Sequence, residues 1–172
     1  MCKGIFIHGR PFSSAKVLFP AYYKKQKTFP PTLNFLVDTG ADTTLINSMD
    51  AMKLGIVYAE SEEGRQIPCF DNVPLEEGKE LKGVGGRIKT YVIRDVMLIL
   101  KTPLTGEFKD HVEYHTEFLD FVCIPEGGAI EIPNLLGRDV INRFKMSYDG
   151  TTETLELVRV PIPGSGYGIH IE

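Results

Sequence analysis

Short apolar runs of β-prone residues recur along this chain, and Ile5 and Ile7 alternate with polar neighbours, a pattern typical of β-strands. Proline and glycine separate the apolar runs and favour turns between them. The strand-like segments are 5–7, 16–19, 33–37, 88–100 and 118–124. The pattern therefore predicts a mainly β protein.

Only short stretches favour a helix. Ser48 suits the N-cap of one helix, residues 49–54 its body and Gly55 its end. Within 134–144, an apolar strand gives way to a second short helix. We therefore expect one or two short helices beside the strands.

Two further segments predict connections between these elements. Residues 59–80 are polar and rich in Glu, Gly and Pro, which predicts a loop. Asp149 and Gly150 stand between two β-prone runs, and this is a strong signal for a hairpin. No repeat, linker or low-complexity segment divides the chain, so we predict a single domain over 1–172.

The composition is that of an ordinary soluble domain: 172 residues, of which 42% are hydrophobic and 24% charged. The net charge of −4, with no Lys/Arg cluster among the aromatics, argues against nucleic-acid binding. No apolar run approaches the ~20 residues that span a membrane, and the N-terminal residues lack the apolar core of a signal peptide. Cys2, Cys69 and Cys123 are odd in number and widely spaced, which predicts reduced thiols and a cytoplasmic protein.

The strand over 33–37 runs directly into the triplet Asp38-Thr39-Gly40. This places a carboxylate at the end of a rigid strand, on a turn that the glycine lets fold back tightly. Two such carboxylates brought together share one proton, so that one acts as base and the other as acid toward a water molecule. The alternative is a chance triplet in an ordinary turn, because Asp and Gly are common turn residues.

Other catalytic chemistries find little support in the sequence. The histidines form no HExxH motif and pair with no Ser or Cys nucleophile motif, and the cysteines lack metal-ligand spacing. The histidines are His8, His111, His115 and His170. We therefore expect neither a metal site nor a cofactor.

The segment LVDTGADTTLI occupies residues 36–46, and NLLGRDVI occupies residues 134–141. Taken together, in this order, they resemble the motifs of the retroviral-type aspartic proteases, the retropepsins and their cellular and prokaryotic relatives. The resemblance covers roughly residues 30–150. It implies a closed, barrel-like β fold with one or two short helices, built as an obligate homodimer, with the motif-bearing core at about 30–158.

The resemblance also assigns roles around the triplet. Asp38 would be the catalytic residue, and Thr39 and Gly40 would support and shape its loop by hydrogen bonds and a tight backbone. The apolar strand that ends in Gly137 would thread this loop.

Three charged residues, Asp42, Arg138 and Asp139, lie in or beside these motifs. The resemblance implies that Arg138 forms an ion pair with Asp42 and so orients the loop. Two unrelated surface charges are the alternative. Asp139 is expected to be structural, because a carboxylate in the first turn of a helix is favoured by the helix dipole.

A glycine-rich stretch, Gly83-Val84-Gly85-Gly86, lies between two β segments. In the family such a hairpin tip is a flap that closes over a bound peptide and excludes water. A plain turn is the alternative, whereas a phosphate loop would need Gly-Lys-Ser/Thr. The resemblance implies that an extended peptide binds between residues 83–86 and Gly40, Ala41 and Asp42, with Ala41, Leu45 and Val84 suggesting apolar side chains near the cut.

Asp38 begins the only Asp-Thr-Gly or Asp-Ser-Gly triplet of the chain. Because the chemistry needs two carboxylates, we predict a C2 homodimer in which two Asp38 side chains meet on the axis and hydrolyse a peptide bond. Such a pair should favour acidic to mildly acidic pH. The alternatives are a catalytically silent or latent dimeric peptide-binding module of the same fold, and a purely structural β protein.

Overall fold

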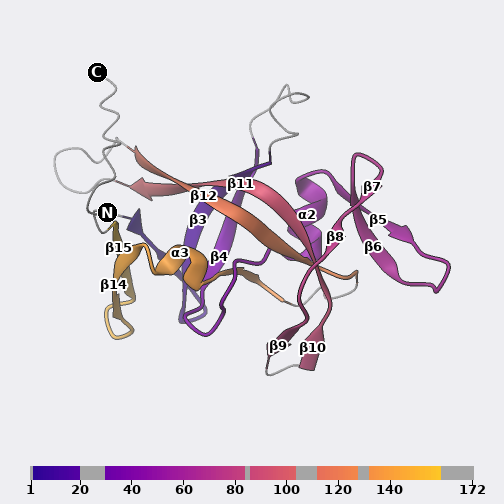
Figure 1. The fold of residues 1–172 in the computed structure, drawn as a ribbon. Helices are drawn as coiled ribbons and strands as arrows, with labels where there is room; N and C mark the ends of the chain where they lie inside the picture. The colour runs from indigo at the N-terminus through magenta and orange to yellow at the C-terminus, as the bar shows by residue number, and fades with distance from the viewer. Residues whose placement is uncertain (1, 20–29, 84–85, 104–111, 128–131, 160–172) are drawn as a thin grey trace, which may run out of the picture.

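The computed structural model describes residues 2–19, 30–83, 86–103, 112–127 and 132–159 (Figure 1). These residues form β-strands and two short helices, so the expected mainly β fold is confirmed. No helix within this described part of the chain is long and apolar enough to cross a membrane.

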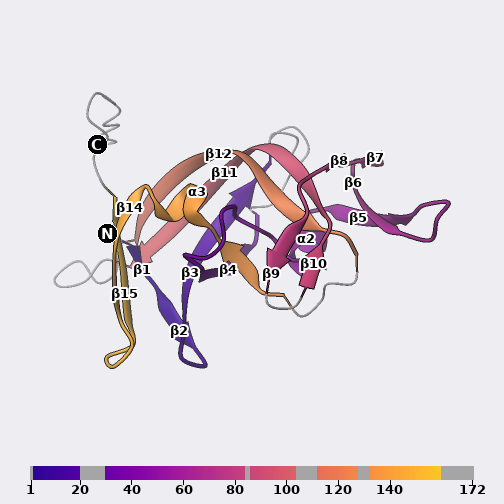
Figure 2. The ribbon, with the colours of Figure 1, turned by 60° about the horizontal axis from the view of Figure 1, so that its bottom comes forward.

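The largest sheet among the described residues has seven strands (Figures 1 and 2). Its main path runs β12–β11–β3–β4–β13, and β13 lies parallel to β4 while the other pairs are antiparallel. Off this path, β2 pairs with β3 and β8 with β11. The strands are β2 (Ile5–Ile7), β3 (Arg10–Leu18), β4 (Thr32–Val37), β8 (Glu76–Glu77), β11 (Thr90–Pro103), β12 (Val112–Pro125) and β13 (Asn134–Leu136).

The core lies on the inner face of this sheet, where alternate side chains point. In β3, Ala15 and Val17 are fully buried while Lys16 between them is not. Phe35 of β4 and Leu98 of β11 join the same apolar cluster. Successive side chains of a strand point to opposite faces, so every second residue of β3 lies in the core.

One residue outside the named strands links the two ends of the main path. Leu45 forms a parallel bridge with Cys123 of β12 and an antiparallel bridge with Leu135 of β13. Among the described residues the path itself is open, and the segment around Leu45 bridges β12 and β13.

Residues 59–80, predicted to be a loop, form strands instead. β5 (Ile56–Glu60), β6 (Gln66–Phe70) and β7 (Val73–Pro74) make a three-stranded sheet, and β8 follows. The prediction of a loop was wrong because most side chains of these strands are exposed. Their polar composition is therefore that of a loop, and no buried apolar face marks the strands in the sequence. Asp71 and Asn72 provide the tight β6–β7 turn through positive φ angles of 53° and 65°.

The first helix, α2 (Ser48–Lys53), begins one residue earlier than predicted. Asn47, not Ser48, is the N-cap, and its side chain accepts a hydrogen bond from the backbone N–H of Asp50 at 2.8 Å. Ser48 is the first helical residue and is buried. The second helix, α3 (Arg138–Ile141), follows β13 as expected.

A separate three-stranded sheet contains the predicted hairpin. β14 (Phe144–Asp149) pairs with β15 (Thr154–Arg159), and β15 also pairs with β1 (Cys2–Lys3). The outer edge of β14 has no strand partner among the described residues, and residues 145–149 are all exposed. In both views the hairpin lies at the margin of the molecule, at the end opposite β5–β7 (Figures 1 and 2).

A buried carboxylate fastens this hairpin to the main sheet. Glu117 of β12 is 1% exposed, and Arg143 donates to its Oε2 at 2.9 Å. Arg159 of β15 lies 3.3 Å from its other oxygen. The two guanidinium groups compensate the charge of Glu117 and connect β12 to the open end of the β14–β15 hairpin.

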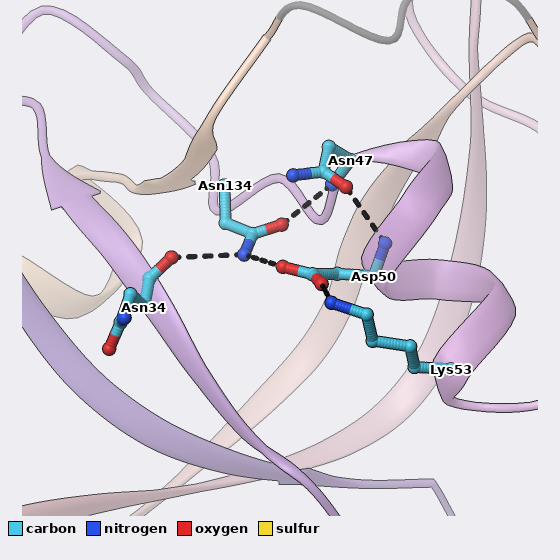
Figure 3. A network of polar contacts seen from close by, with 5 residues as sticks. All are labelled: Asn34, Asn47, Asp50, Lys53 and Asn134. Carbon is cyan, nitrogen blue, oxygen red and sulfur yellow. Dashed lines mark hydrogen bonds and ion pairs between the residues drawn. The ribbon is translucent and has the colours of Figure 1, made fainter.

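The side chain of Asn134 connects three elements around the start of β13 (Figure 3). Its Nδ2 donates to the backbone oxygen of Asn34 in β4 at 2.9 Å and to Asp50 Oδ2 in α2 at 2.5 Å. Its Oδ1 accepts from the backbone N–H of Asn47 at 2.8 Å. Because Asn134 is 2% exposed, these partners replace water as its hydrogen-bonding groups.

We expect Asn134→Ala to lower the free energy of unfolding by ~2–4 kcal/mol, because it leaves several buried polar groups without partners. Urea denaturation followed by far-ultraviolet circular dichroism measures the change. Asn142→Ala, at an exposed position just after α3, is the matched control and should cost less than ~0.5 kcal/mol. Equal effects of the two substitutions would contradict a role for the Asn134 network in stability.

Candidate active site

The loop that carries Asp38 leaves the end of β4 beside the end of β13. The backbone N–H of Asp38 donates to the carbonyl of Leu136 at 3.1 Å, which continues the β4–β13 pairing by one step. Gly40 N–H then donates to Asp38 Oδ1 at 2.8 Å. The carboxylate is therefore held at the turn, and it remains partly exposed to solvent.

The chain returns from this loop on the other side of β13. Leu45 and Leu135 exchange backbone hydrogen bonds of 2.9 and 2.8 Å. Ile46 N–H donates to the carbonyl of Cys123, whose own N–H donates to Thr44. The strand β13 thus lies between the two arms of the Asp38 loop, as the resemblance implied for the strand ending in Gly137.

The turn after β13 also forms hydrogen bonds with the Asp38 loop. Arg138 N–H donates to the carbonyl of Ala41 at 2.8 Å, and Asp139 N–H donates to that of Asp42 at 3.3 Å. The structure also places the Arg138 guanidinium in an ion pair with the Asp42 carboxylate. Both side chains are exposed, so solvent screens the pair and its contribution to stability is small.

Thr44 and Asp139 form a partly buried contact at the site, which the sequence did not reveal. Thr44 is fully buried, and its hydroxyl donates to Asp139 Oδ1 at 2.7 Å while its backbone N–H donates to Oδ2 at 2.9 Å. Asp139 is structural, as expected, but it acts chiefly through this bond to a residue 95 positions away. Val140 N–H also donates to it at 3.0 Å.

Gly137 lies where two backbones meet most closely. A Cβ at this position would stand 2.4 Å from the carbonyl carbon of Thr43 and 2.8 Å from the nitrogen of Thr44. Its N–H donates to the Thr44 hydroxyl at 3.2 Å. Only a residue without a side chain allows β13 to end against the Asp38 loop in this way.

Thr39 and Ala41 make fewer contacts than their neighbours. Thr39 is exposed, and its side chain has no hydrogen bond to another described residue of the same chain. Ala41 is partly buried, with its N–H donating to the carbonyl of Asp38 at 3.2 Å. The expectation that Leu45 lines a substrate pocket was wrong, because Leu45 is 1% exposed and packs beneath the loop.

A hairpin follows the glycine-rich pattern of the sequence. β9 (Leu81–Gly83) pairs with β10 (Gly86–Ile88), and Gly83 lies opposite Gly86. Gly86 has a φ of 113°, which favours glycine. Val84 and Gly85, the expected flap tip, lie outside the described residues.

Metal binding and thiol chemistry are two further possibilities for groups near this loop. Among the described residues, no group of three or more His, Cys, Asp and Glu side chains could hold a metal ion. Cys123 lies below the Asp38 loop, but burial raises the pKa of its thiol, so it stays protonated and is a poor nucleophile. Cys69 and Cys123 are both buried and free.

Comparison with known proteins identifies the fold. No protein-family model and no curated protein sequence matches this chain. Among solved structures, a retropepsin-like aspartic protease from Rickettsia conorii is similar over 89% of this chain and 94% of its own, with a TM-score of 0.50 and 19% identity. EIAV protease complexed with the inhibitor HBY-793 is similar over 79% of this chain and 88% of its own, with a TM-score of 0.42 and 17% identity. The fold is thus that of the retropepsin-like aspartic proteases, and the resemblance drawn from the motifs is confirmed at the level of fold.

We expect Gly137→Ala to lower the free energy of unfolding by ~3 kcal/mol or more, because the added carbon meets backbone that cannot move aside. Thermal and urea unfolding measure the loss. Gly150→Ala is the control, since its nearest contact is the far end of the Tyr148 side chain at 3.0 Å. A Gly137→Ala protein as stable as the control would refute the close approach described here.

Proposed function

We propose that two copies of this chain form an aspartic endopeptidase, with one Asp38 from each copy in a shared catalytic pair. The observation that carries this proposal is the Asp38 loop itself, which is partly exposed and held by backbone hydrogen bonds on both sides of β13. We further propose that residues 1–172 serve this activity as one domain, with its motif-bearing core at about 30–158. The cysteine usage of the sequence supports a cytoplasmic location.

The proposed reaction is hydrolysis of a peptide bond by water. One Asp38 carboxylate takes a proton from a water molecule as its oxygen attacks the scissile carbonyl carbon. The other Asp38, protonated, hydrogen-bonds to the carbonyl oxygen, and a proton then passes to the leaving nitrogen. Two carboxylates and water suffice for these steps. In this role Gly40 keeps each Asp38 carboxylate in place through its N–H.

The proposed substrate is an extended peptide between the Asp38 loop and the hairpin β9–β10. Gly40, Ala41 and Asp42 would lie on one side of it, and Gly83, Val84, Gly85 and Gly86 on the other. Gly40 and Asp42 are exposed, as access to a peptide requires. Closure of the hairpin would exclude water and strengthen the electrostatic interactions of the pair.

The outer edge of β14, which has no strand partner among the described residues, supports the proposed homodimer. An antiparallel pairing of two β14 strands about a two-fold axis through Ser147 would place Lys145 opposite Asp149 of the second copy, and Met146 opposite Tyr148. Both pairs are favourable across strands, the first by charge and the second by contact of sulfur with an aromatic ring. Tyr148 already stacks on Phe6, with 5.7 Å between ring centroids, so its ring is oriented by its own chain.

We expect the protein to cleave members of a peptide library at acidic to mildly acidic pH, and Asp38→Asn to reduce the rate at least ~1,000-fold, because an amide cannot act as the base. Mass spectrometry of the digest measures both. Asp120→Asn, which neutralises an exposed carboxylate of β12, is the control and should retain activity.

The digest also separates the proposed enzyme from the peptide-binding module. Peptides that bind without being cut at any pH would favour the module. Cleavage that persists in Asp38→Asn would exclude Asp38 as the catalytic group.

For the interface, we expect Ser147→Cys to form a dimer-linking disulfide on mild oxidation. Residues directly opposite in an antiparallel pair have Cα atoms ~4.5–5.5 Å apart, within the range that a disulfide spans. Lys145→Cys is the matched control. In this pairing the two residues at position 145 would lie about four residues, or ~13 Å, apart along the strands, too far for a disulfide. Non-reducing electrophoresis measures the fraction of cross-linked dimer, and the oxidised wild type gives the level of cross-linking without the new cysteine. Equal cross-linking of both variants would place the interface elsewhere.

A further inference from the structure

The three-stranded sheet β5–β6–β7 projects from the molecule at the end opposite the β14–β15 hairpin (Figures 1 and 2). β6 lies between the other two strands, so β5 and β7 each have an outer edge without a strand partner among the described residues. Such an edge presents backbone N–H and C=O groups that can pair with another chain. The sheet therefore offers two candidate surfaces for an added strand.

The edge of β7 is protected against such pairing, whereas the edge of β5 is not. β7 has two residues and ends in Pro74, which has no N–H to donate. β5 has five residues, Ile56–Glu60, with no Lys or Pro among them. It pairs with β6 in continuous register, without a bulge. Because proteins usually interrupt exposed edges with one of these devices, the intact edge of β5 indicates a surface that binds a strand.

The hydrogen bonds of β6 show which backbone groups of β5 point outward. Leu75 N–H donates to the carbonyl of Pro68 at 2.9 Å, so this carbonyl points toward β7 and away from β5. Tyr58 lies opposite Pro68 in the β5–β6 pair, and its own N–H and C=O therefore point to the outer edge. Glu60, two residues further on, points the same way. Among the described residues, neither Tyr58 nor Glu60 has a backbone hydrogen bond at that edge.

The side chains of β5 alternate between the two faces of its sheet. Val57 and Ala59 share one face and are exposed, Val57 by 50%. Tyr58 and Glu60 lie on the other face, where Glu60 is exposed. A strand added beside β5 would place every second side chain next to Val57 and Ala59, and the side chains between them on the face of Glu60.

The charge around this edge indicates which side chains the added strand would carry. Residues 56–74 hold four carboxylates and one guanidinium, a net charge of −3 out of −4 for the whole chain. Glu62 and Glu63 follow β5 in the turn to β6, and both are exposed. Arg65 lies 3.0 Å from Glu63, whereas Glu60 and Glu62 have no cationic partner among the described residues. Basic side chains complement this charge.

We propose that the outer edge of β5 binds an extended protein segment in which basic and apolar side chains alternate, by adding it to the sheet as a further strand. The basic side chains lie near Glu60, and the apolar ones pack next to Val57 and Ala59. The outward backbone groups of Tyr58 and Glu60 supply the hydrogen bonds. Because this site does not include Asp38, the proposal goes beyond the proposed function and does not depend on it.

Binding of a synthetic peptide to Asp38→Asn protein tests the site without any cleavage. The probe is Thr-Lys-Val-Lys-Val-Lys-Thr with an N-terminal fluorescent label and a C-terminal amide, and fluorescence anisotropy at low salt measures Kd. We expect a version with Glu in place of Lys, and a scrambled version without alternation, to bind at least ~10-fold more weakly. Higher salt should weaken binding of the basic probe, because it screens exposed charges. Equal binding of the three peptides would overturn the proposal.

Two substitutions of Glu60 separate the contribution of its charge from that of its backbone. We expect Glu60→Gln, which removes the charge, to raise Kd for the basic probe ~3-fold. Glu60→Pro also removes the outward N–H and should raise Kd at least ~10-fold, while the β5–β6 hydrogen bonds, in which this N–H takes no part, remain. Asp120→Asn removes an exposed carboxylate of β12 and is the control, with a change of less than ~2-fold. An unchanged Kd in folded Glu60→Pro would contradict strand addition.

Amide hydrogen exchange, measured residue by residue by NMR, gives a second readout that needs no substitution in β5. We expect the basic probe to slow exchange of the Tyr58 and Glu60 N–H groups at least ~5-fold, because they gain hydrogen-bond partners. The N–H groups of Val57 and Ala59 point to β6 and should change less. Protection elsewhere without protection of Tyr58 and Glu60 would refute the site. If the protein binds no probe and Glu60→Pro separates a dimer in sedimentation, a second copy of the chain takes the edge and the proposal fails.

Discussion

The candidate site depends on one constraint, the insertion of β13 between the two arms of the Asp38 loop. β4 pairs with β13 on one side, and Leu45 bonds to it on the other. Because these ties are made by backbone groups, most side chains in the loop can vary without moving Asp38. The tolerance ends at Gly137, where the backbones approach too closely for any Cβ.

Buried polar ties fix both ends of β13. Asn134 bonds to β4 and to α2 at its start, and Asp139 bonds to Thr44 just beyond its end. A shift of β13 by one residue would break both ties and would turn its buried side chains outward. The register that sets the position of Asp38 is thus specified by hydrogen bonding as well as by apolar packing.

The sequence predicted the parts of this structure that local patterns encode. Apolar and β-prone runs predicted the long strands, and the resemblance carried by the Asp38 triplet and the apolar run before Gly137 implied the loop and its threading strand. The strands within 59–80 were missed because their exposed side chains give no alternation. Asn47 and Ser48 can both cap a helix, and the choice depends on Asn134, a distant residue. The Thr44–Asp139 tie likewise joins residues far apart in the chain, which no local pattern records.

The exposed edge of β14 bears on how the activity would be regulated. A site assembled from two copies forms in proportion to the square of the chain concentration when dimers are scarce. Under the proposed pairing, a diluted or newly made chain is inert until it meets another. The concentration of the chain would then control its activity. At low concentration, a twofold change in expression would change the amount of dimer about fourfold.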